Sequence, residues 1–128
     1  MTTDAIQDSA RMTVTSIKPT KRDPERRMIR VGQEVVATLE RRVIEALGVC
    51  EGMEWTDELA ARVEDASTHD RLRRYAINAL GRRALSEGEL VDRLKRRGAS
   101  EEHARSLAGE MRELGIIDDE SYAEAVVR

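Results

Sequence analysis

Short helical patterns follow one another from residue 72 to residue 128, and serine residues stand where two of them begin. Ser86 and Glu89 have the spacing of a capping box, so a helix is predicted from about residue 87 to Gly98. Ser100 precedes two glutamates, which favours the start of another helix, and Gly115 stands where a left-handed residue would end it. Helices this short are unstable alone, so they must pack against one another.

The apolar residues of this segment recur at helical spacing and indicate which faces are buried. A lead-in from residue 72 and the segment 75–85 place Tyr75, Ala76 and Ala79 on one side of a first helix. We predict one shared core made of Leu72, Leu80, Leu90, Leu94, Leu107, Met111 and Leu114. A fourth helical pattern covers 120–128, where we expect Tyr122 to pack back on the unit while two valines, Val126 and Val127, stay partly exposed.

The N-terminal part of the chain has the period of strands instead. β-branched residues at 12–17 favour a strand, and the basic segment 18–24, with two prolines, is predicted to be a connector. The apolar segments 28–31 and 34–39 flank Gly32-Gln33, and a glycine at the first of two turn positions suits a type II′ hairpin. A small antiparallel sheet of two or three strands is therefore expected.

Helical spacing returns beyond the hairpin. Val43, Ile44 and Leu47 predict a short helix that Gly48 stops. Thr56 is expected to cap a helix over 57–65. Ser67, with Asp70 three residues later, is expected to begin the next long helix. Aromatic residues make up only 2% of the chain and phenylalanine is absent, so the core must be aliphatic and rich in alanine, which suits small packed helices.

Residues that could support catalysis or bind a metal do not form a recognisable set. Cys50 has no histidine nearby in the sequence, and we interpret it as an incidental thiol. His69 and His103 fall in predicted first helical turns without Cys, Asp or Glu partners at metal-ligand spacing. Asp118-Asp119 is interpreted as a helix cap rather than an acid–base pair. We therefore expect neither an enzyme nor a cofactor or metal.

Basic residues are the more informative group, although the formal net charge is −3. One set stands at the ends of two successive predicted helices and could emerge on the same side: Arg82, Arg83, Arg93, Lys95, Arg96 and Arg97. A second set lies on and beside the hairpin: Lys18, Lys21, Arg22, Arg26, Arg27 and Arg30. Each set has two interpretations. Cations stabilise helix C-termini or solvate loops, and they also bind phosphates or acidic protein surfaces.

The amino-acid sequence of the helical segment resembles that of a known family. ALGRRALSEGELVDRLKRRGAS at 79–100, followed by LAGEMRELGIIDDESYAEAVVR at 107–128, is similar to the first helical repeat of the RecX family of regulatory proteins. The hairpin followed by a small helical segment is similar, less specifically, to the N-terminal region of that family. RecX proteins usually have three tandem three-helix repeats, whereas this chain ends just as a second repeat would begin. It is therefore either a fragment or a naturally short relative.

The resemblance implies a fold that is mainly α with a small N-terminal β-hairpin or sheet, α+β overall. The expected division is a disordered tail at 1–10, the hairpin with short helices at 11–67, a three-helix repeat of RecX type at 68–117, and the start of a further helix at 118–128.

The resemblance also implies binding to the RecA recombinase filament on single-stranded DNA. There the chain would restrain strand exchange, ATP hydrolysis and the co-protease activity that RecA supports. The alternative left open is a direct DNA-binding helical module, because short helices with a basic end are compatible with helix-turn-helix use.

No segment has the character of a signal peptide or a membrane span, so we expect a cytoplasmic protein. We also expect a monomer with at most a weak DNA contact of its own.

Overall fold

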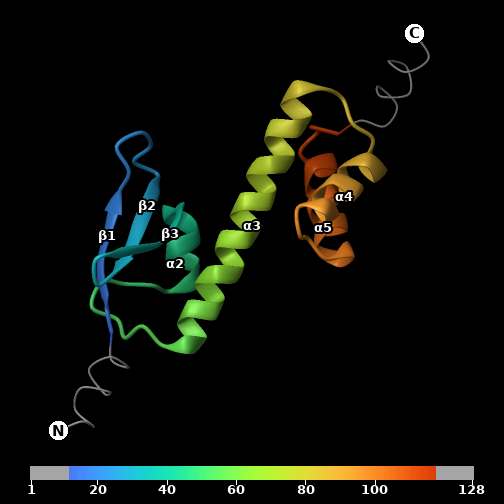
Figure 1. The fold of residues 1–128 in the computed structure, drawn as a ribbon. Coiled ribbons are helices and arrows are strands. Elements are labelled where there is room, and N and C mark those ends of the chain that lie inside the picture. Colours follow the sequence, from blue (N-terminus) through green and yellow to red (C-terminus); the bar gives the residue numbers. More distant parts are fainter. Residues whose placement is uncertain (1–11, 118–128) are drawn as a thin grey trace, which may run out of the picture. The chain divides into compact units, whose positions relative to one another are not determined.

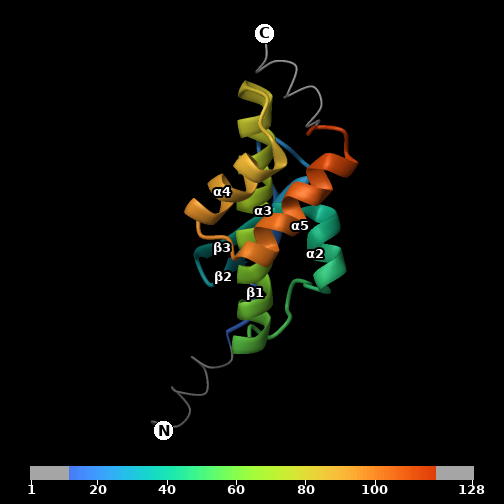
Figure 2. The ribbon, with the colours of Figure 1, turned by 90° about the vertical axis from the view of Figure 1, so that its right-hand side faces the viewer.

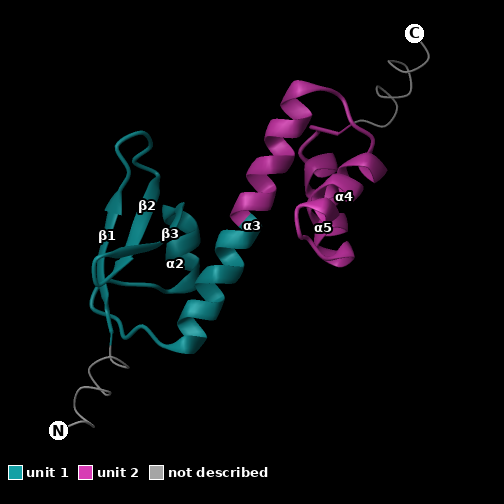
Figure 3. Ribbon diagram, in the orientation of Figure 1, with its two compact units in different colours: residues 1–69 teal, residues 70–128 magenta. Residues whose placement is uncertain are grey.

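The computed structural model describes residues 12–117, which divide between His69 and Asp70 into two compact units (Figure 3). The elements, labelled in Figure 1, are β1 (Val14–Pro19), β2 (Arg26–Val31), β3 (Glu34–Glu40), α2 (Arg41–Leu47), α3 (Asp57–Arg82), α4 (Glu87–Arg96) and α5 (Glu101–Glu113). The α+β class is confirmed. The expectations for the tail at 1–10 and for 118–128, Asp118-Asp119, Tyr122, Val126 and Val127 among them, lie outside the described residues.

The first unit is built on an antiparallel sheet in the order β1-β2-β3. Val31 pairs with Glu34, so the loop between β2 and β3 has only two residues. Gly32, the first of them, has a φ of 64°, a conformation that side chains with a Cβ rarely adopt. The predicted hairpin of β2 and β3 is confirmed. β1 pairs with β2 and completes the three-stranded sheet.

The predicted boundary of the first strand was wrong. β1 continues through Lys18 and Pro19, which pair with Met28 and Arg27 of β2. Pro19 is tolerated there because β1 is an edge strand, where a missing backbone N–H does not interrupt a second ladder. The remaining connector is closed by Thr20, whose backbone N–H donates to the carbonyl of Arg26 at 2.9 Å.

One face of the sheet is covered by α2 and by the first half of α3 (Figure 1). Their shared core consists of Val14, Ile29, Ala37, Leu39, Ile44, Val49, Leu59 and Val63. Helix α2 ends, as predicted, at Gly48, which has a φ of 74°. The sheet, α2 and the start of α3 therefore enclose an aliphatic core of their own.

Helix α3 is one continuous element, which corrects the predicted break before Ser67. Thr56 does cap its start, since the Thr56 hydroxyl accepts from the backbone N–H of Leu59 at 3.1 Å. No glycine or proline follows until Gly81. Each residue that extends a helix adds a hydrogen bond, whereas nucleation of a new helix is unfavourable. The helix therefore continues through Ser67. His69 consequently lies in mid-helix rather than in a first turn.

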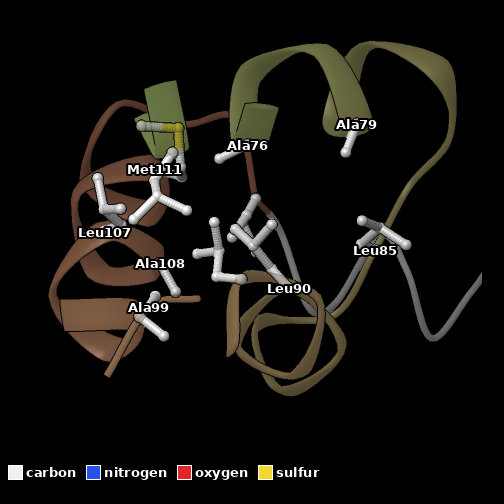
Figure 4. Packing of buried hydrophobic residues seen from close by; sticks show 12 residues of the cluster. Ala76, Ala79, Leu85, Leu90, Ala99, Leu107, Ala108 and Met111 are labelled. Atoms are coloured by element: carbon white, nitrogen blue, oxygen red, sulfur yellow. The ribbon is translucent and has the colours of Figure 1, made fainter. Parts of the chain in front are cut away.

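The second unit packs the C-terminal half of α3 beside α4 and α5 (Figures 1 and 2). Figure 4 shows Ala76 of α3, Leu90 of α4 and Met111 of α5 directed into the same core. The buried cluster consists of Leu72, Ala76, Ala79, Leu85, Leu90, Leu94, Ala99, Ala104, Leu107, Ala108, Met111 and Ile117. Its many alanines allow the three helices to approach closely, as the composition predicted.

Two residues of the predicted core are not fully buried. Leu80 is only partly buried at the edge of the cluster, and Leu114 is 55% exposed. Leu114 is the C-cap residue of α5, and Gly115 then turns the chain with a φ of 78°. This turn brings Ile117 into the core in place of Leu114.

Serine caps fix the starts of both short helices, as predicted. The Ser86 hydroxyl accepts from the N–H of Glu89 at 3.1 Å, and the Ser100 hydroxyl accepts from the N–H of His103 at 3.0 Å.

An ion pair of 2.8 Å between Arg73 Nε and Glu110 Oε1 links α3 to α5. This ion pair adds a side-chain link between α3 and α5 to the shared core.

Candidate functional site: an arginine hollow between α3 and α4

The end of α3 and the end of α4 enclose a hollow of about 310 Å³. Its lining residues are Tyr75, Asn78, Ala79, Arg82, Arg83, Arg93 and Arg97, and we call it the arginine hollow. The two basic sets that stand at the ends of successive helices thus meet at one place. Four guanidinium groups in one small concavity make it strongly electropositive.

Helical spacing explains this convergence. Asn78 and Ala79 stand three and four residues after Tyr75, and four and three residues before Arg82, so all of these residues share one side of α3. Arg93 and Arg97 are four residues apart and share one side of the α4 end in the same way. Arg83 directly follows α3 and completes the wall.

An aromatic ring supports one of these arginines. The guanidinium carbon of Arg97 lies 4.3 Å from the centroid of the Tyr75 ring, the geometry of a cation–π contact. Tyr75 also packs against the buried cluster, and it is half-buried. The sequence placed Tyr75 on an apolar face but gave no reason to connect it with Arg97.

Most of the lining arginines have no carboxylate partner among the residues that the structure describes. Arg83 lies 3.5 Å from Glu89, a long ion pair on the rim. Arg82, Arg93 and Arg97 form no ion pair within residues 12–117. Within residues 12–117, the positive charge of the hollow is therefore largely uncompensated.

Two residues of the predicted helical set stand apart from the hollow. Lys95 and Arg96 are exposed and are not among its lining residues, and Lys95 Nζ lies 3.8 Å from Glu101 Oε1. Lys95 follows Arg93 by only two residues, which places it on another side of α4. Arg96 ends α4 and is exposed outside the hollow.

The second predicted set is divided by the alternation of a strand. Arg26 and Arg30 lie on the same face of β2 as Met28, opposite which Lys18 stands on β1. Arg27 lies on the other face, where it lines a small hollow with Ile44 of α2. The remaining two cations, Lys21 and Arg22, are exposed in the connection between β1 and β2.

Backbone contacts engage two of these sheet arginines. Arg26 Nη2 donates to the carbonyl of Thr38 at 2.9 Å, and Arg30 Nη1 donates to the carbonyl of Gln33 at 3.4 Å. The Nε of Arg27 is buried without a hydrogen-bond partner in the described part of the chain. Lys18, Arg26 and Arg30 therefore share one face of the sheet, and Arg27 lies on the other.

The residues considered for other chemistry remain scattered. Cys50 is an exposed free thiol. Within residues 12–117, no three His, Cys, Asp or Glu side chains come close enough together to hold a metal ion. Over the same range, none of the helices combines the length and the apolar character that crossing a membrane requires.

Comparisons with known proteins point to one family. Residues 73–107 match the model of "RecX, first three-helix domain". The regulatory protein RecX of Caldanaerobacter subterraneus is 32% identical over 81 residues, which are 63% of this chain and 41% of that protein. The regulatory protein RecX of a Geobacillus species is 28% identical over 119 residues, 90% of this chain and 44% of that protein. The chain thus spans less than half the length of these relatives.

A solved structure shows the same fold. The crystal structure of a regulatory protein RecX superposes with a TM-score of 0.72 at 20% identity, covering 91% of this chain and 57% of that one. The resemblance found in the sequence is thereby confirmed: residues 73–107 match the first three-helix domain of the RecX regulatory proteins, and the chain shares the fold of a solved RecX structure.

Proposed function

We propose that this chain regulates the RecA recombinase by binding to the RecA filament on single-stranded DNA. Bound there, it inhibits strand exchange, ATP hydrolysis and the co-protease activity of RecA, in recombination, DNA repair and the SOS response. The proposal follows from the RecX resemblance, because the relatives are named as regulatory proteins.

One observation supports the proposal above the others. Every residue that lines the arginine hollow falls between Tyr75 and Arg97, inside the segment that matches the RecX first three-helix domain. The segment that matches the family model is thus also the segment whose cations lack carboxylate partners within residues 12–117. A filament on DNA offers both phosphates and acidic side chains to such a surface.

In this proposal the chain acts by binding rather than by catalysis. It works as a monomer in the cytoplasm, without a cofactor, and any contact with DNA alone is weak. The arginine hollow is its principal contact, and the sheet cations Lys18, Arg26 and Arg30 are the alternative contact.

A direct DNA-binding module is the second candidate, and the same hollow favours it. The two candidates differ in what the chain requires of its partner. A regulator of the filament needs RecA and DNA together, whereas a DNA-binding module needs DNA alone.

Co-sedimentation separates them. The chain is mixed with RecA assembled on single-stranded DNA, with the same DNA without RecA, and with RecA without DNA. We expect most of the chain to pellet with the filament and little with either component alone. Equal recovery on DNA alone would favour the DNA-binding module, and no recovery on the filament would refute the regulator.

A further inference from the structure

We propose that the arginine hollow holds backbone phosphates of a single nucleic acid strand, and that Asn78 and Tyr75 belong to this site. The inference rests on the proposed function, because it names what the hollow contacts within a filament. It adds to that function a specific ligand, a defined set of side chains and two residues that charge alone does not identify.

The hollow is suited to an anion. Arg82, Arg93 and Arg97 have no carboxylate partner in the described part of the chain, so their donors are available. A guanidinium presents several N–H donors in a planar fork that pairs with two phosphate oxygens at once. The volume of about 310 Å³ is at the small end of the range for ligand sites. It gives room for a phosphate and part of its sugar.

The number of arginines and their spacing favour a strand over an acidic protein segment. One carboxylate is satisfied by a single bidentate guanidinium, so four guanidiniums exceed its needs. Arg93 and Arg97 are four residues apart, which separates their Cβ atoms by about 5–6 Å. A nucleic acid strand repeats its charge about every 3.4 Å along a duplex axis. A strand thus brings several charges to the hollow, whose guanidiniums come from α4 and from the end of α3.

Asn78 and Tyr75 have different parts in this site. Asn78 lines the hollow four residues before Arg82 on the same side of α3, where its amide can donate to a phosphate oxygen. Tyr75 is a positioning residue, because its ring lies under the Arg97 guanidinium at 4.3 Å. The ring holds that guanidinium at the wall and so reduces the entropy that Arg97 loses when a phosphate binds.

The direct test uses the whole chain without RecA and a fluorescent oligothymidylate, followed by anisotropy over a series of salt concentrations. We expect Arg82→Gln with Arg93→Gln, one change in each wall, to weaken binding at least tenfold. The slope of log affinity against log salt should fall by about 1.4, since each contact with single-stranded nucleic acid contributes about 0.7.

A matched control removes the same charge outside the hollow. Lys95→Gln with Arg96→Gln alters the same helix, and we expect less than a threefold loss of affinity. If both double variants weakened binding equally, general charge would explain it and the hollow would not be the site. If the Arg82→Gln and Arg93→Gln chain lost stability but kept its affinity, these arginines would serve the helix ends only, and the inference would be overturned.

Competitors identify the ligand. Poly-glutamate tests a carboxylate partner, and ATP tests a free nucleotide as the source of the phosphate. We expect neither to displace the oligothymidylate at equal charge concentration. Displacement by poly-glutamate would assign the hollow to an acidic protein, and displacement by ATP would assign it to a nucleotide.

Tyr75 has its own test. Tyr75→Phe retains an aromatic face under Arg97 and should bind oligothymidylate like the parent. Tyr75→Leu should reduce the salt slope by about 0.7, the loss of one contact. If Tyr75→Leu lowered the unfolding midpoint and left the slope unchanged, Tyr75 would be a core residue without a part in the site.

The oligothymidylate experiment and the filament experiment can fail independently of each other. Filament binding that persists while the chain alone ignores oligothymidylate would overturn the phosphate site and leave the regulator standing. Oligothymidylate binding at the hollow together with no filament binding would do the reverse.

Discussion

The basic residues of the two units are distributed differently, although both units contain a similar set of them. In the first unit the alternation of β2 sends Arg26 and Arg30 to one face and Arg27 to the other. In the second unit the packing of α4 beside α3 brings Arg82 and Arg93, which lie on different helices, to one hollow. A run of basic residues is therefore a poor guide to a basic surface, and the period of the element that contains it decides the outcome.

The units also differ in how their elements are joined. Backbone hydrogen bonds connect all three strands of the first unit. The helices of the second unit satisfy their backbone internally, so contacts between helices come from the buried cluster and from side-chain pairs such as Arg73 with Glu110. We therefore expect the second unit, which contains the candidate site, to be the more sensitive to loss of core volume.

Truncation of a buried leucine should have the largest effect. Leu107→Ala empties a site with no solvent exposure and should destabilise the second unit by about 2–5 kcal/mol. Urea unfolding gives the magnitude, and hydrogen exchange should show the loss beyond Asp70 with the strands still protected. Leu114→Ala is the control, because its side chain is 55% exposed and the change should stay within about 0.5 kcal/mol. Equal effects of the two changes would contradict the core described for this unit.

Proline at Thr68 tests whether α3 is one helix shared by both units. In the interior of a continuous helix the change should cost about 3 kcal/mol or more, because it removes a hydrogen bond and clashes with the preceding turn. Had a second helix begun with Ser67 as its cap, position 68 would be the first helical residue, where proline is favoured. Thermal unfolding, with Thr68→Ala as the control, decides between them. A proline variant as stable as the alanine variant would restore the break.

Loss of a serine cap should have a smaller effect. Ser86→Ala and Ser100→Ala each remove the acceptor for an N–H of the first turn and should cost about 1 kcal/mol. Glycine at the same positions should cost only a few tenths of a kcal/mol. Thermal melts followed by circular dichroism measure both. Alanine variants that melt like the parent would show that packing alone fixes the starts of α4 and α5.

The ion pair between α3 and α5 should contribute least. A double-mutant cycle with Arg73→Ala and Glu110→Ala should give a coupling of at most about 1 kcal/mol, since both side chains are partly exposed to water. The coupling should decrease as salt is added. A coupling of several kcal/mol that salt does not change would mean that this pair, rather than the core, organises the second unit.

Much of the fold was predictable because its signals are local. Ser86, Ser100, Gly48 and Gly115 mark helix ends through their own hydrogen bonds or backbone angles, and Gly32 marks the hairpin turn. Other features depend on the surroundings. Ser67 looks like a cap in the sequence, but helix continuation outweighs that local preference.

The candidate site was predictable only in part. The sequence pointed to Arg82, Arg83, Arg93 and Arg97, because cations cluster visibly at two helix ends. It also grouped Lys95 and Arg96 with them, since only the fold shows which side of α4 faces α3. Asn78 and Tyr75 carried no charge signal, although their spacing from Arg82 on one helical side could have suggested them.

We propose that the second unit makes the contact with the RecA filament and that the first unit does not. Co-sedimentation with RecA filaments on single-stranded DNA tests it with two variants of equal charge loss, Arg82→Gln with Arg93→Gln in the hollow and Lys18→Gln with Arg30→Gln on the open sheet face. We predict that the hollow variant loses most of its filament binding while the sheet variant pellets like the parent. Loss of binding by the sheet variant with the hollow variant unaffected would place the contact on the first unit instead.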